Sequence, residues 1–152
     1  MIDFKTGGDD GTYDALVSAL APLRDAGHLT TWSSAGGLVQ GAVTVVGTGE
    51  TPLQKVLDAD PRDIFYDAGL DSLPDSGIEW GPDIAPLASA DWGNTDKDAA
   101  QEHVDDAHSR GIKTRFWNAG DGDRQTFLDI GSDFLNSDDL QAAKDWIAEH
   151  AA

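Results

Sequence analysis

The feature that most constrains this sequence is its alternation of short β-branched runs with segments of helical periodicity. Residues 42–46 (AVTVV) form a nearly continuous apolar run, which is typical of a strand buried on both faces. Residues 12–24 instead carry apolar side chains at steps of three and four, and Gly27 follows as a helix stop. Connections as short as residues 110–113 lead from helix to strand. We therefore predict an α/β fold with parallel strands and right-handed crossovers.

The other segments continue this pattern. Residues 69–86 are rich in Gly, Pro, Asp and Ser, and so long a loop inside a compact domain is usually functional or mobile. Residues 87–92 are compatible with a short strand or with a loop. We predict strands at residues 1–5, 62–66, 113–117 and 134–136, a small hairpin or irregular excursion at 29–40, a polar turn at 7–11, and helices at 51–57, 95–110, 121–130 and from Asp138 onward.

The composition is that of a soluble globular protein with a single domain, residues 1–152. No apolar run is as long as a membrane span, and we recognise no signal peptide. Twenty-eight acidic residues against ten basic ones give a net charge of −18, which disfavours nucleic acid and anionic membranes as partners. An anionic substrate would need a local lysine, arginine or metal ion. Neither the acidity nor the absence of cysteine fixes the compartment.

Asp3 and Lys5 stand two residues apart in the first predicted strand, so their side chains should share one face while Phe4 turns to the other. Taken alone, this pair is most simply an ion pair at a strand end. Ligands of parallel α/β folds, however, bind beyond the carboxyl ends of the strands. Polar or aromatic residues stand at those ends: Asp3, Lys5, Thr48, Glu50, Asp67, Asp91, Trp92, Trp117, Asn118, Asn136 and Asp138. Their convergence indicates a site.

Some of these residues have a purely structural alternative, and several familiar signatures do not fit. Trp92 and Trp117 could close the core instead of forming a pocket wall, and Asp138 could cap a helix. Residues 47–49 lack the third glycine of a dinucleotide fingerprint. Two histidines on one predicted helix are five residues apart, which is not the spacing of a zinc pair. We expect all four histidines to be solvated rather than catalytic.

Six segments, in order along the chain, resemble a known family. They are residues 2–6 (IDFKT), 43–49 (VTVVGTG), 64–68 (IFYDA), 87–92 (LASADW), 111–118 (GIKTRFWN) and 135–140 (LNSDDL). Together they are similar to the C-terminal part of the phosphatidylinositol-phospholipase-C-like phosphodiesterases. The branch that they resemble most is that of the bacterial glycerophosphodiester phosphodiesterases.

The resemblance implies a (βα)8 barrel, represented here by about its last five βα units. It also implies hydrolysis of a phosphodiester, either a small molecule or a lipid headgroup, with Ca²⁺ or Mg²⁺. The family's fourth strand carries a metal-binding carboxylate and, two residues on, a lysine that contacts the phosphate; Asp3 and Lys5 fit these roles. Trp117 would line the pocket on the seventh strand. The remaining residues expected to bind substrate are Arg115, Asn118, Asn136 and Trp92.

One departure from the family limits this expectation. Its two catalytic histidines and its Glu-x-Asp metal ligands lie on the first three barrel strands, and no segment of this chain matches them. We therefore expect a C-terminal portion with little activity alone and with open sheet edges that permit self-association. A non-catalytic half-barrel for binding or assembly is the alternative, and an unrelated doubly wound binding domain is a third. The sequence does not identify the substrate alcohol, and it does not separate hydrolysis from cyclising transfer.

Overall fold

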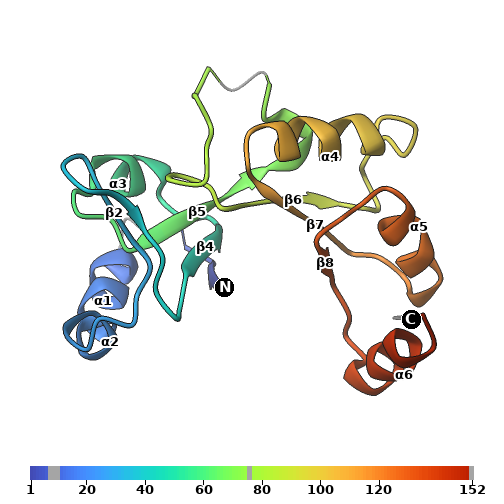
Figure 1. Cartoon of the computed structure of the whole chain (residues 1–152), viewed down its shortest axis with the longest axis horizontal. Coiled ribbons are helices and arrows are strands. Elements are labelled where there is room, and N and C mark those ends of the chain that lie inside the picture. Colours follow the sequence, from blue (N-terminus) through green and yellow to red (C-terminus); the bar gives the residue numbers. More distant parts are fainter. Residues whose placement is uncertain (7–10, 75–76, 151–152) are drawn as a thin grey trace.

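A computed structural model describes residues 1–6, 11–74 and 77–150, so most of the predicted turn at residues 7–11 lies outside the described residues. Its centre is a six-stranded sheet in which every neighbouring pair is parallel (Figure 1). The order across the sheet is β1 (Ile2–Phe4), β4 (Val45–Gly49), β5 (Ile64–Gly69), β6 (Leu87–Asp91), β7 (Lys113–Trp117) and β8 (Phe134–Leu135). The predicted parallel α/β fold is confirmed, and its form is that of a partial barrel.

The sheet is curved, and the helices lie around its convex side (Figure 1). They are α1 (Thr12–Ala19), α2 (Ala21–Asp25), α3 (Leu53–Asp58), α4 (Ala100–Ser109), α5 (Arg124–Asp129) and α6 (Leu140–His150), with short 3₁₀ turns η1 (Leu70–Ser72) and η2 (Asp121–Asp123). Within the described ranges, no helix is long and apolar enough to cross a membrane. β1 and β8 are the two edges of the sheet, as expected for an open barrel.

The strand count differs from the expectation drawn from the resemblance. Residues 87–91 form a full strand, β6, that pairs with both β5 and β7. The sheet therefore has six strands where about five βα units were expected. If β7 and β8 hold the seventh and eighth barrel positions, β1 holds the third position and not the fourth. The placement of the Asp3–Lys5 motif on a fourth strand is thus not supported by the topology.

Alternation along the strands separates a core face from a concave face. Phe4 is buried and stacks against Tyr13 of α1, with ring centroids 6.3 Å apart. The neighbouring Asp3 and Lys5 are exposed on the other side of β1, so the predicted division of faces is confirmed. Apolar residues of the other strands pack in the same way beneath the helices, in two clusters around α1–α3 and around α4–α5.

Trp92 belongs to this core. Its ring makes edge contacts with Phe116 and Phe127, at centroid distances of 5.1 and 4.9 Å, and its side chain is buried. Trp92 continues the outward phase of Ala88 and Ala90 just after β6, which directs it towards α5 and away from the concave face. Of its two predicted roles, closing the core is the one that the structure shows.

The predicted hairpin is also present. β2 (Thr31–Ser33) and β3 (Gly37–Val39) pair antiparallel. The buried Arg62 guanidinium stacks on the Trp32 ring at 4.7 Å and donates to the main-chain carbonyls of Val56, Leu57 and Asp83. One arginine thus fastens the hairpin to α3 and to the loop before β6.

Some element boundaries moved for local reasons. β4 begins at Val45 and not at residue 42, because Val43 is held in a separate bridge with Leu29. The helix predicted from residue 95 begins at Ala100, since the Thr95 hydroxyl turns back to the carbonyl of residue 91. Asp139, rather than the predicted Asp138, caps α6: its carboxylate accepts from the main-chain amides of residues 141 and 142.

Candidate functional site

A cleft of about 660 Å³ opens on the concave face, at the carboxyl ends of β1, β4, β5, β6 and β7. The predicted site residues Asp3, Lys5, Arg115 and Trp117 all line it. The full lining is Met1, Asp3, Lys5, Thr48, Gly49, Tyr66, Asp67, Ala68, Gly69, Ser89, Arg115 and Trp117. The parallel topology therefore brings together residues that are up to 116 positions apart, at the edge where such folds bind ligands.

A polar row crosses the sheet with one residue from each strand or its end: Asp3, Thr48, Asp67, Ser89, Arg115 and Asn136. Asn136 lies outside the cleft lining, and the other five residues form the floor of the cleft. Asp67 lies at its centre. Its two carboxylate oxygens accept hydrogen bonds of 2.7 Å from the hydroxyls of Thr48 and Ser89. Its side chain is only 3% exposed, and this burial raises the pKa of Asp67 against the opposing effects of the two hydroxyls and Arg115.

Arg115 is the cation of the polar row. Its Nε donates to the Ser89 hydroxyl at 3.1 Å, and its Nη1 donates to Asn136 Oδ1 at 3.4 Å. Its Nη2 lies 3.7 Å from Asp67 Oδ2. A guanidinium has five N–H donors, so these three contacts leave donors that can serve a ligand. The predicted substrate residues Arg115 and Asn136 are therefore in contact, with Arg115 lining the cleft.

Asp3 and Lys5 form the rim, with Lys5 Nζ 2.5 Å from Asp3 Oδ2. Their side chains are 47% and 80% exposed, so the pair contributes little to stability. Both the strand-end ion pair and the common face predicted from the sequence are present. What the structure adds is the position of this pair, which borders the same cleft as Arg115.

Asp3 can supply one ligand to a divalent cation, but the described residues do not assemble a complete protein cage. Among them, no group of three His, Cys, Asp or Glu side chains is placed to hold a metal ion. Mg²⁺ keeps several waters and commonly takes only one or two carboxylates together with substrate phosphate, whereas Ca²⁺ needs six to eight oxygens. The donor set therefore fits one carboxylate contact to Mg²⁺ better than a Ca²⁺ cage.

The remaining predicted residues lie at the margin or away from the cleft. Trp117 is 42% exposed and forms one wall. Asn118 has a positive φ of 56° and donates to Asp91 Oδ1 at 2.7 Å, a bond that lowers the pKa of Asp91. Asn118 thus shapes the turn after β7. Trp92 lies in the core, as described above, and is not among the lining residues.

None of the four histidines lines the cleft, and all four belong to the described part of the chain. His103 and His108 on α4 face Asp71 and Asp133, with nitrogen–oxygen distances of 3.2 and 2.9 Å. His150 stacks on Trp146 of the same helix. His28 lies between α2 and the hairpin. The chain's own cleft therefore contains no imidazole for proton transfer.

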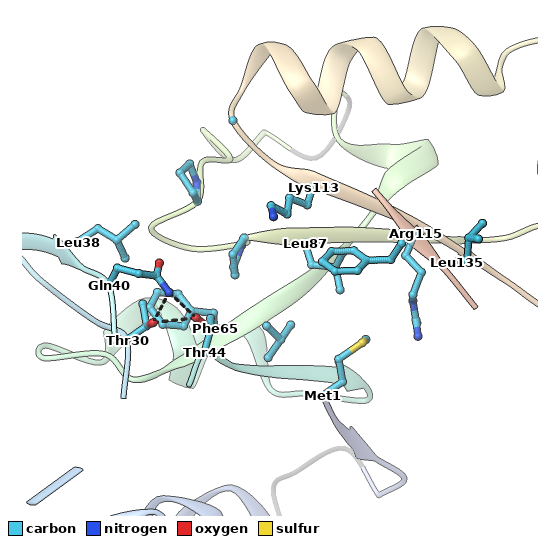
Figure 2. A pocket seen from close by; sticks show the side chains of 15 residues that line it. Met1, Thr30, Leu38, Gln40, Thr44, Phe65, Leu87, Lys113, Arg115 and Leu135 are labelled. Carbon is cyan, nitrogen blue, oxygen red and sulfur yellow. Dashed lines mark hydrogen bonds between the residues drawn. The ribbon is translucent and has the colours of Figure 1, made fainter. Parts of the chain in front are cut away.

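A second cavity of about 570 Å³ lies nearer the amino ends of the strands (Figure 2). Its walls are largely apolar, with Val46, Phe65 and Leu87 on the sheet. The Gln40 amide bonds the Thr30 and Thr44 hydroxyls at its far end (Figure 2). Arg115 lines both spaces. Apolar layers at this level are usual inside parallel barrels, so we assign the chemistry to the polar cleft.

Sequence reasoning missed Ser89 and did not single out Thr48 or Asp67 as site residues. Thr48 and Asp67 were noted as polar strand ends, but their contact across β4 and β5 depends on strand register. Ser89 stands inside β6, in the alternation Leu87-Ala88-Ser89-Ala90-Asp91. A polar residue in the phase opposite to the buried alanines is the signal that could have found it.

Comparison with known proteins gives a phosphodiesterase relationship. Residues 1–67 match the family model of the AIM6-like phosphodiesterase domain. Altered inheritance of mitochondria protein 6 homolog of Arthroderma benhamiae is 33% identical over 94% of this chain and 51% of its own length. Altered inheritance of mitochondria protein 6 of Candida glabrata is 32% identical over 93% of this chain and 43% of its own length. No solved structure matches significantly.

The chain spans about half the length of the curated relatives that it matches. The matched segment contains Lys5 of the rim and three members of the polar row, Asp3, Thr48 and Asp67. These matches support a phosphodiesterase-type relationship, but they do not single out the phosphatidylinositol-phospholipase-C-like enzymes that the sequence resembles. Residues 1–67 are thus similar to the AIM6-like phosphodiesterase domain, and more than nine tenths of the chain is similar to altered inheritance of mitochondria protein 6 and its homolog.

Proposed function

We propose that this chain provides the phosphate-binding wall of a metal-dependent phosphodiesterase site for glycerophosphodiester or phosphoinositide-type substrates. The observation that carries the proposal is the presence of Lys5 and Arg115 in one cleft of a chain similar to AIM6-like phosphodiesterases. The cleft lies at the carboxyl ends of parallel strands, where this class of fold binds its ligands.

Charge supports a phosphodiester as the ligand. The chain carries −18 overall, so an anion binds only where local cations outweigh the general repulsion. Lys5 supplies a mobile ammonium at the rim, and Arg115 supplies a planar fork suited to two phosphate oxygens. The exposed Trp117 ring gives an apolar wall for the alcohol portion of the ester.

The proposed metal contact is Asp3. A divalent cation held there would neutralise charge on the phosphoryl oxygens of the substrate. Lys5 and Arg115 would orient the phosphate from the protein side. Because the cleft contains no imidazole, protonation of the leaving alcohol has no histidine donor within this chain. We therefore expect ligand binding by the 152-residue chain but little turnover.

Titration calorimetry with glycerophosphocholine, with and without Mg²⁺ or Ca²⁺, tests the proposal. Lys5→Ala should weaken binding, whereas Lys144→Ala on α6 removes the same charge outside the cleft and should not. No binding by the wild-type chain under any of these conditions would overturn the proposed site. Robust Ca²⁺-dependent turnover that Lys5→Ala abolishes would support the site but contradict the expected inactivity.

A second candidate is a non-catalytic half-barrel that binds or assembles, because both sheet edges expose apolar side chains. Ile2 on β1 is 41% exposed and Phe134 on β8 is 45% exposed. Exposed edges favour pairing with another chain. Sedimentation over a wide concentration range separates the two candidates, since a strictly monomeric species that binds the phosphodiester would leave only the first.

A further inference from the structure

Asp67 is a buried carboxylate whose position is not explained by packing. It stands in the polar row at the floor of the cleft, with its side chain 3% exposed. Burying a carboxylate is costly, and apolar residues of similar volume often serve stability as well or better. Ionisable groups buried in a cleft beside a specific charge partner are often functional. The partner here is Arg115.

The contacts around Arg115 define an orientation. Its Nε donates to the Ser89 hydroxyl, and that hydroxyl donates to Asp67 Oδ1. The other carboxylate oxygen, Oδ2, accepts from Thr48 and faces Arg115 Nη2. Asp67 therefore fixes two sides of the guanidinium, one directly and one through Ser89.

Arg115 needs such support because its side chain lies between two spaces. It lines the apolar cavity as well as the cleft, and Figure 2 shows it pointing to the side of the sheet on which Met1 lies. A long side chain with many rotamers loses freedom when it binds an anion, and a contact that orders it beforehand removes part of that cost. We propose that Asp67 is a positioning residue that holds Arg115 in the orientation that binds the phosphate. This inference rests on the proposed phosphodiester site.

A double-mutant cycle tests it, with dimethyl phosphate as the probe because this small phosphodiester reports the phosphate contacts alone. Its affinity is measured by ³¹P NMR titration for the wild type, Asp67→Asn, Arg115→Met and the double variant. We expect Asp67→Asn to weaken binding by about five- to tenfold in the wild-type background. In the Arg115→Met background the Asp67→Asn substitution should leave the affinity for dimethyl phosphate unchanged, because Asp67 acts through Arg115.

Equal losses in both backgrounds would overturn the inference, as would unchanged or tighter binding by Asp67→Asn. Circular dichroism and thermal unfolding establish that each variant is folded. If Asp67→Asn does not fold, Ser89→Ala breaks the same relay while leaving the carboxylate, and the cycle is repeated with that variant. Unchanged binding by Arg115→Met would instead show that Arg115 does not belong to the phosphate site. The Lys5→Ala measurement would still test whether the rim binds the phosphodiester.

Discussion

Gly49 gives the sharpest test of how the strand pairing positions the site. It ends β4 opposite β1, with a φ of +67°. A Cβ added there would lie 2.3 Å from Asp3 Oδ1 and 2.6 Å from the Phe4 carbonyl oxygen. The left-handed backbone costs a non-glycine residue about 1–2 kcal/mol. The contacts add about 1–3 kcal/mol because a backbone oxygen must move. Gly49→Ala should therefore cost about 2–5 kcal/mol of unfolding free energy.

Gly27 is a matched control for the backbone term. Its φ is +68°, and no atom lies within 4 Å of its added Cβ. Gly27→Ala should then cost only the strain of about 1–2 kcal/mol. Urea unfolding of both variants measures the difference. Glycerophosphocholine affinity should fall in Gly49→Ala alone, since Asp3 lies on the displaced strand and Lys5 directly follows it.

Equal unfolding losses in the two glycine variants would refute this reasoning. That result would mean that β1 shifts at no cost, and that the pairing of Phe4 with Gly49 does not determine where Asp3 lies. A larger loss in Gly49→Ala with unchanged ligand affinity would keep the steric argument but separate the rim pair from binding.

Three further changes probe the scaffold. Arg62→Met leaves three main-chain carbonyls, one buried and two partly buried, without their donor. It should therefore cost about 3–5 kcal/mol in urea unfolding, and a loss under about 1 kcal/mol would contradict that role. Phe116→Ala opens a cavity beside Trp92, with an expected loss of about 3–5 kcal/mol and a changed near-ultraviolet spectrum. The third change is Asp133→Asn. Partial burial acts to raise the pKa of Asp133, but hydrogen bonds from His108 and a main-chain amide hold this pKa below its ordinary 3.8. The wild type should therefore be more stable than Asp133→Asn above pH 3.8, and this advantage should disappear as the pH falls further. A stability difference that does not change with pH would show that the ionisation of Asp133 is not linked to folding.

The parallel sheet and the face of the rim pair could be predicted because both follow from local periodicity. Residues 113–117 form the predicted strand with the predicted limits. Phe4 points into the core while Asp3 and Lys5 point away, as a period of two requires. These features depend only on neighbours along the chain.

The centre of the cleft could not be predicted, because it depends on contacts between strands. Thr48, Asp67 and Ser89 come together only in the strand register that the sheet adopts. The register of neighbouring parallel strands could not be read from the local sequence pattern. Trp92 was ambiguous for a related reason. Its outward direction follows from the phase of β6, which became evident only once residues 87–91 were found to form a complete strand.

The two cations of the cleft are held in different ways, and this difference assigns them different tasks. A phosphodiester must compete with Asp3 for Lys5, whereas Arg115 keeps its contact with Asp67 and meets the ligand through its remaining donors. The Lys5–Asp3 pair is exposed to solvent, so separating it costs little and Lys5 can follow the ligand. Arg115 is held by the polar row, so it can bind only a phosphate that reaches the floor of the cleft. We therefore expect Lys5 to capture the anion at the rim and Arg115 to orient the bound phosphate.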